Sequence, residues 1–144
     1  AHTPDGMKNV LKTVRNLAKN KVIVVFGCGG DRDQKKRPLM GKVAEKFGDY
    51  FVITNDNPRN EDPQKIIEDI EMGLSNNIDG DKYKIITNRE QAIFHAVRKA
   101  VKDDIIVIFG KGHETYQIFK DKTIHFDDRE VARNAIKSIK KERI

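Results

Sequence analysis

The stretch VIVVFGCGG, residues 22–30, decides the fold predicted for this chain. It starts with a continuous apolar run, 22–26, that is rich in β-branched residues, and it ends in a loop with three glycines. A strand that is apolar at every position is typical of a parallel sheet whose two faces are covered by helices. The sequence therefore predicts a central parallel strand that is followed by a glycine-rich loop.

The segments on either side continue this pattern. Further short apolar runs at 50–54, 83–87 and 105–109 indicate strands, and residues at helical spacing lie between them. Residues 116–119 and 123–126 predict an antiparallel edge hairpin. Helices are expected from Pro4 to about Lys19, from Pro38, after the cap Asp62, after the cap Asn88 and after Asp127.

Strands that alternate with helices indicate right-handed crossovers. We therefore predict a single α/β domain over residues 1–144, with a Rossmann-like, doubly wound, mostly parallel sheet and an antiparallel edge hairpin.

The composition narrows the class of protein. The chain has 144 residues, 38% hydrophobic and 35% charged, and a formal net charge of +6. The charge favours an anionic partner, although Lys and Arg are scattered along the chain. The single cysteine, Cys28, excludes an internal disulfide and favours a reducing compartment. No signal-peptide pattern or membrane-spanning apolar run occurs. A helix start at Thr3-Pro4, so close to residue 1, suggests a piece of a longer chain.

The unusual loops follow the first, second and fourth predicted strands, at the sheet edge where such folds bind ligands. The first loop, FGCGGDRDQKKRP, is not a dinucleotide fingerprint, because Arg32 takes the place of the third glycine, and it lacks the G-K-[ST] of a P-loop. Arg32, Lys35, Lys36 and Arg37 make it cationic near a helix start, which suits an anion. A solvated charged loop is the alternative interpretation.

The second loop, TNDNPRNEDP, contains Asn57-Pro58-Arg59. Proline has a fixed φ and restricts the residue before it, so Asn57 and Arg59 are presented on stiff backbone. This arrangement suits recognition better than a simple reversal of the chain.

The third loop, FGKGHETY, places Glu114 after glycines that suit a tight turn or an N–H nest. We expect Glu114 to face Arg32 and Arg59, either as the acceptor of a substrate ammonium or as the partner of one arginine. His113 has no second histidine at ligand spacing, so no metal site is predicted.

Together the loops offer two arginines, one amide and one carboxylate. Arginine binds carboxylates with two parallel hydrogen bonds, and a carboxylate binds an ammonium, so this set suits a zwitterionic amino acid. No loop supplies a pair of nucleophile and base, and Cys28 is interpreted as a small packed residue.

Five stretches, AHTPDG, GCGGDRDQKKRPLMG, TNDNPRNEDP, GKGHETYQ and HFDDREVA, resemble in order and spacing the C-terminal domain of Mur ligases, of the type that adds meso-diaminopimelate. The resemblance implies a three-domain cytoplasmic enzyme of peptidoglycan synthesis. Its N-terminal domain holds the UDP-sugar. Its central domain carries the ATP P-loop, the Mg²⁺ ligands and a carbamylated lysine. Its C-terminal domain brings the amino acid and closes over ATP.

The reaction that the resemblance implies uses ATP to phosphorylate the D-glutamate side chain of UDP-N-acetylmuramoyl-L-alanyl-D-glutamate. The amino group of diaminopimelate then attacks the acyl phosphate and gives an amide, ADP and phosphate. Lysine-adding relatives usually lack the arginine of the DNPR motif.

The resemblance also assigns residues. Those that resemble the diaminopimelate-binding set are Arg32, Asn57, Arg59, Gly110 and Glu114, with Asp56, Asn57, Pro58 and Arg59 as the recognition motif. His2 resembles part of a nucleotide-contacting hinge. The P-loop, the Mg²⁺ ligands and the carbamylated lysine are not in this sequence. The resemblance therefore assigns no catalytic residue to this chain and implies that the chain alone does not catalyse the reaction.

Two alternatives stay open. A stand-alone nucleotide- or nucleic-acid-binding module would fit the net charge and the glycine loops, but the basic loops lack aromatic platforms, which weighs against nucleic acid. Lanthionine, which has the same two ends as diaminopimelate, is an alternative substrate. Neither nucleic acid nor a membrane is expected as a partner.

Overall fold

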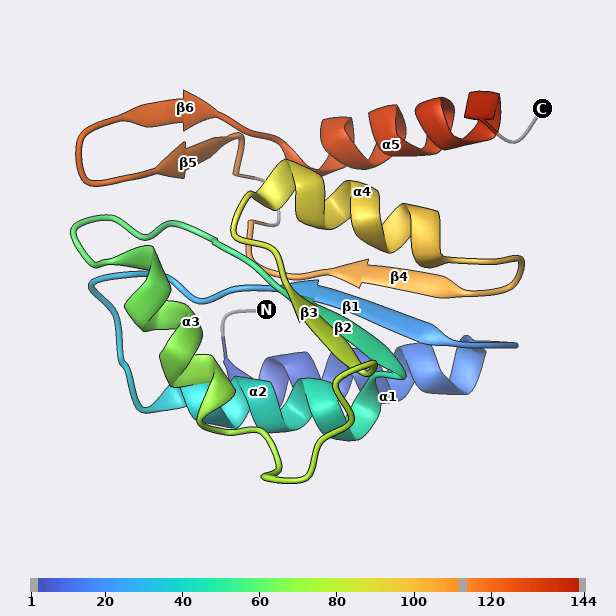
Figure 1. Ribbon diagram of the computed structural model, residues 1–144, viewed down its shortest axis with the longest axis horizontal. Helices are drawn as coiled ribbons and strands as arrows, with labels where there is room; N and C mark the ends of the chain where they lie inside the picture. The colour runs from blue at the N-terminus through green and yellow to red at the C-terminus, as the bar shows by residue number, and fades with distance from the viewer. Residues whose placement is uncertain (1–2, 112–113, 143–144) are drawn as a thin grey trace.

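The computed structural model describes residues 3–111 and 114–142 of the chain. Four parallel strands form the central sheet: β1 (Val22–Phe26), β2 (Tyr50–Ile53), β3 (Tyr83–Ile85) and β4 (Ile105–Ile108). Their order is β3-β2-β1-β4, so β1 has a parallel neighbour on each side (Figure 1). The predicted central strand is confirmed.

Alternate residues of β1 face two separate cores. Val22, Val24 and Phe26 belong to the core under α1 (Pro4–Leu17), α2 (Lys36–Phe47) and α3 (Pro63–Glu71). Ile23 and Val25 belong to the core under α4 (Arg89–Lys99) and α5 (Asp128–Glu142). Figure 1 shows these two helix layers on opposite faces of the sheet. Because successive side chains of a strand point to opposite faces, an unbroken apolar run is the sequence that this sandwich requires.

The predicted helix caps are present. Thr3 Oγ1 accepts a hydrogen bond from the Gly6 N–H, Asp62 Oδ1 from the Gln64 N–H, and Asn88 Oδ1 from the Gln91 N–H. The predicted start of the second helix at Pro38 is wrong, because α2 begins at Lys36. Proline lacks an N–H, and a helix needs none in its first turn, so Pro38 sits inside that turn without breaking it.

The hairpin forms as predicted, from β5 (Tyr116–Ile118) and β6 (Thr123–His125), and is a two-stranded sheet of its own. A main-chain hydrogen bond attaches it to the loop after β2, since the Arg59 N–H donates to the carbonyl of Ile118 at 3.0 Å. In Figure 1 it lies at the end of the molecule where the loops after β1 and β2 lie. None of the described helices is long and apolar enough to cross a membrane.

Candidate functional site

The loops after β1, β2 and β4 meet at the carboxyl edge of the sheet around a cavity of about 240 Å³. It is lined by Gly29, Arg32, Lys36, Asp56, Asn57, Arg59 and Glu114. Four of the five predicted substrate-binding residues are therefore brought together from three separate loops. The fifth, Gly110, is not among these lining residues, and His2 lies outside the described residues.

Gly110 contributes through its backbone. Its φ of +126° is open to glycine and costly for other residues, and a Cβ there would lie 3.4 Å from the Asp56 carboxyl group and the Arg89 guanidinium. This conformation turns the chain after β4 toward the second loop.

Hydrogen bonds hold the second loop against the first. The Gly30 N–H donates to the carbonyl of Asn57 at 2.7 Å, and Arg59 Nη1 donates to the carbonyl of Gly30 at 3.0 Å. Arg59 has a φ of 54°, which is uncommon for a residue with a side chain and persists only where neighbours enforce it. The stiffness predicted from Pro58 is therefore reinforced by contacts with the first loop and with β5.

The Asn57 side chain is buried, and its oxygen is fully engaged. Its Oδ1 accepts hydrogen bonds from Lys111 Nζ at 2.8 Å and from the Ile118 N–H at 2.9 Å, and its Nδ2 donates to Glu114 Oε1 at 3.4 Å. Lys111 Nζ also bonds Asp56 Oδ1 at 2.9 Å. The acid of the DNPR motif is thus neutralised from within the protein.

Lys111 was missed in the sequence, because lysine is almost never fully buried unless it is paired. Its side chain is completely shielded from solvent. Burial lowers the pKa of the Lys111 ammonium, and the charge of Asp56 opposes that effect. A lysine between two glycines after an apolar strand, with an acid in the neighbouring loop, was the available signal.

Glu114 has no ion pair among the described residues. Besides the long contact with Asn57, it accepts only a 3.5 Å hydrogen bond from the Tyr116 hydroxyl. The interpretation in which Glu114 pairs with Arg32 or Arg59 is therefore wrong for the described part of the chain. Its carboxylate keeps acceptor capacity that faces the cavity.

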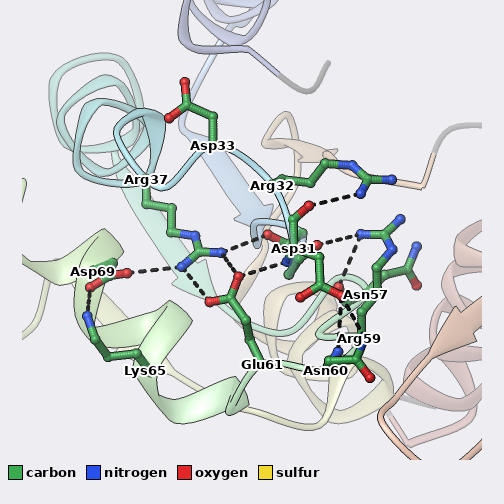
Figure 2. Close-up of polar contacts among 12 residues, drawn as sticks. Asp31, Arg32, Asp33, Arg37, Asn57, Arg59, Asn60, Glu61, Lys65 and Asp69 are labelled. Atoms are coloured by element: carbon green, nitrogen blue, oxygen red, sulfur yellow. Dashed lines mark hydrogen bonds and ion pairs between the residues drawn. The ribbon is translucent and has the colours of Figure 1, made fainter.

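Arg32 and Arg59 each use one guanidinium nitrogen to bond the loop backbone, and Arg59 donates to the carbonyl of Gly30 at 3.0 Å (Figure 2). The Arg32 side chain donates to the carbonyl of the adjacent Asp31, at 3.1 Å. Both side chains line the cavity with Lys36, so this wall is cationic.

Arg37 does not belong to the anion-binding group that the sequence predicted. It is buried, and it donates to both carboxylate oxygens of Glu61 at 2.8 and 3.0 Å, to Asp69 at 3.0 Å and to the carbonyl of Gly29 at 3.0 Å (Figure 2). Burial disfavours its charge, but the bonds to Glu61 and Asp69 outweigh that and raise its pKa. Arg37 ties the first loop to the second loop and to α3.

Arg89 is a further buried cation, after Lys111 and Arg37, that the sequence did not reveal. It makes two bonds to Asp128, at 2.8 and 2.7 Å, and donates to the carbonyls of Asn55 and Phe109, both at 2.9 Å. It therefore joins the ends of β2 and β4 to the start of α5. Helix periodicity alone places it on a helix surface, so no sequence signal predicted this role.

Cavity volume alone would favour a different depression as the candidate binding site. A depression of about 480 Å³ lies between α2 and the segment after α3 and is lined by residues such as Lys42, Glu45 and Leu74. Glu45 is already engaged by Ser75 there. The smaller cavity is the better candidate, because guanidinium, amide and carboxylate groups from three loops converge in it.

Fold and cavity together define an α/β domain with a doubly wound parallel sheet and a zwitterion-compatible pocket at its carboxyl edge. The family model described as "Mur ligase, glutamate ligase domain" matches residues 1–112. The chain belongs to this family.

Similar proteins agree with this assignment. The chain is 57% identical over 137 residues to a UDP-N-acetylmuramoyl-L-alanyl-D-glutamate--2,6-diaminopimelate ligase of Halalkalibacterium halodurans, covering 95% of this chain and 27% of the relative. It is 53% identical over 139 residues to such a ligase of Clostridium acetobutylicum, covering 96% and 28%. A solved structure of such a ligase superposes with a TM-score of 0.89 at 43% identity, covering 96% of this chain and 28% of that one. The chain thus spans little more than a quarter of these proteins.

Proposed function

We propose that this chain is the amino-acid-binding domain of an ATP-dependent ligase that adds meso-diaminopimelate to UDP-N-acetylmuramoyl-L-alanyl-D-glutamate in peptidoglycan synthesis. The observation that carries the proposal is the cavity that joins Arg59, the amide of Asn57 and Glu114, which has no ion pair among the described residues. The printed names of the relatives support the choice of diamino acid.

The groups in the cavity match the two ends of an amino acid. Arg32 and Arg59 offer forked donors for carboxylates, and Glu114 offers an acceptor for an ammonium. Lysine lacks the distal carboxylate of diaminopimelate, so it would leave a guanidinium without its partner. The site therefore selects diaminopimelate over lysine for two reasons. Diaminopimelate gains a contact, and bound lysine leaves a charged donor of the protein without a partner.

The chain's part in the reaction is to bind the diamino acid and hold its amino group for attack on the acyl phosphate. No group of three or more His, Cys, Asp or Glu side chains within residues 3–111 and 114–142 is suited to hold a metal ion. Because the described residues do not fit Mg²⁺, we assign Mg²⁺ and most contacts with ATP to other domains of the ligase. We also propose that the enzyme is located in the cytoplasm.

The test is an NMR titration of the ¹⁵N-labelled chain with meso-diaminopimelate, L-lysine, lanthionine, ATP and a short DNA duplex. We expect saturable shifts at Asn57, Arg59 and Glu114 with diaminopimelate, and weaker shifts with lysine. Equal shifts with lanthionine and with diaminopimelate would show that the domain binds both amino acids. Shifts with DNA or ATP alone would replace the proposal by a nucleotide-binding module.

A further inference from the structure

We propose that Lys111 is a positioning residue that fixes the amide of Asn57 so that its NH₂ group faces the ligand and helps to select a carboxylate there. This inference deepens the proposed function and rests on it. It concerns a residue that does not line the cavity and acts through one that does.

The orientation of Asn57 follows from the groups around it. A lysine ammonium carries three donors and no acceptor, and a backbone N–H is a donor only. Lys111 Nζ and the Ile118 N–H both point at one end of the Asn57 amide, at 2.8 and 2.9 Å. That end must therefore be the oxygen, because a flipped amide would set its NH₂ group against two donors in a buried place.

The chemistry that Asn57 presents to the cavity follows from this orientation. With its oxygen held from behind, only the NH₂ group remains on the side of Glu114. Asn57 thus offers donors, like the nearby Arg59, and a ligand ammonium would find no acceptor on it. The donors of Asn57 and Arg59 suit a carboxylate, whereas the neighbouring Glu114, 3.4 Å from the Asn57 NH₂ group, suits an ammonium.

Lys111 itself is fixed by its surroundings. Asp56 Oδ1 holds the ammonium at 2.9 Å, and both side chains are almost completely buried. Asp56 and Asn57 in the cavity wall and Lys111 behind them therefore form a connected polar group, in which the charges cancel and the amide is locked. Such a group has one favourable arrangement when every member is satisfied.

The experiment measures the ratio of the lysine Kd to the diaminopimelate Kd by NMR titration. Lys111→Met should lower this ratio by about tenfold or more, since the amide oxygen then keeps only one of its two donors, the Ile118 N–H, and turns toward the ligand more easily. Lys111→Arg, which keeps a charged donor, should restore part of the ratio. Asp128→Asn breaks another buried ion pair outside the cavity and should lower the melting temperature without changing the ratio. Equal weakening of both ligands in Lys111→Met would overturn the inference.

A second variant covers the case in which Lys111→Met does not fold. Asn57→Asp keeps an oxygen for Lys111 and Ile118 and replaces the NH₂ group by a second oxygen. It should remain folded and lose the preference for diaminopimelate, and an unchanged ratio would contradict the inference. Absence of any preference in the wild-type chain would instead overturn the proposed function, and the inference with it.

Discussion

Gly30 lies against the carbonyl group of Pro58 so closely that a Cβ at position 30 would be 1.7 Å from the carbonyl oxygen. The contact joins the loop after β1 to the DNPR loop, backbone against backbone, next to the 2.7 Å hydrogen bond from Gly30 to Asn57. Only a residue without a side chain allows this approach. The relative position of Arg32 and Arg59 therefore depends on a glycine.

Gly30→Ala should separate the two loops, because the new methyl group meets rigid backbone. We expect a loss of about 1–3 kcal/mol in stability and a larger relative loss in diaminopimelate affinity. Gly80→Ala is the matched control, since nothing lies within 4 Å of a Cβ there. Thermal unfolding and NMR titration of both variants check this prediction. Equal behaviour of the two variants would contradict it.

Arg59→Ala should reduce the preference for diaminopimelate over lysine by about 1.5–3 kcal/mol, the usual contribution of a charged hydrogen bond. Arg59→Lys should recover only part of it, because an ammonium cannot form the forked pair with a carboxylate. The measurement is the pair of dissociation constants for each variant. A preference that survives in Arg59→Ala would show that this loop is only a structural turn.

Glu114→Ala should weaken diaminopimelate binding by about 1.5–3 kcal/mol and leave the melting temperature almost unchanged. The reason is that Glu114 has no ion pair among the described residues and makes only long hydrogen bonds. Glu68→Ala removes an exposed acid far from the cavity and should change neither quantity. A large fall in melting temperature with unchanged affinity would make Glu114 a structural residue.

Glu61→Gln should destabilise the chain in a pH-dependent way. Arg37 lowers the pKa of Glu61 below its ordinary 4.5. A lowered folded pKa means stability that is complete above about 4.5 and is lost as the pH falls through the folded value. The difference between wild type and variant should be about 1–3 kcal/mol at pH 7 and should shrink below pH 4.5.

Urea unfolding across this pH range checks the sign of the Glu61 effect. Glu142→Gln is the control, because Glu142 pairs with Arg98 on the surface, where such pairs contribute about 0–1 kcal/mol. A difference that grows toward low pH would show that Glu61 does not have a lowered pKa.

Cys28 should resist alkylation in the folded chain. Burial raises the pKa of its thiol to about 12, so only about one molecule in ten thousand carries a thiolate at pH 8. The side chain packs beside Met40, with the two sulfurs 3.9 Å apart. Iodoacetamide labelling followed by mass spectrometry should be slow in buffer and fast in denaturant. Labelling in buffer at the rate of a free thiol would disprove this.

Most of the architecture could be predicted from local sequence. The apolar run of β1, the caps at Thr3, Asp62 and Asn88, and the hairpin residues each encode their structure through period and local hydrogen bonding. The start of α2 was misplaced by two residues, because Pro38 is compatible with either the first or the third position of a helix. Such boundary errors arise where two placements satisfy the same local rule.

The sequence by itself determined the order of strands and helices along the chain and the loops that line the cavity, with Arg32, Asn57, Arg59 and Glu114 among them. Tertiary structure alone decided which charges are free. Arg37 and Lys111 look like ordinary basic loop residues, yet both are buried by partners far away in the chain, Glu61 and Asp69 for one and Asp56 for the other. The physical reason is that burial of a charge depends on acids supplied by other loops, and their meeting is set by the packing of the sheet.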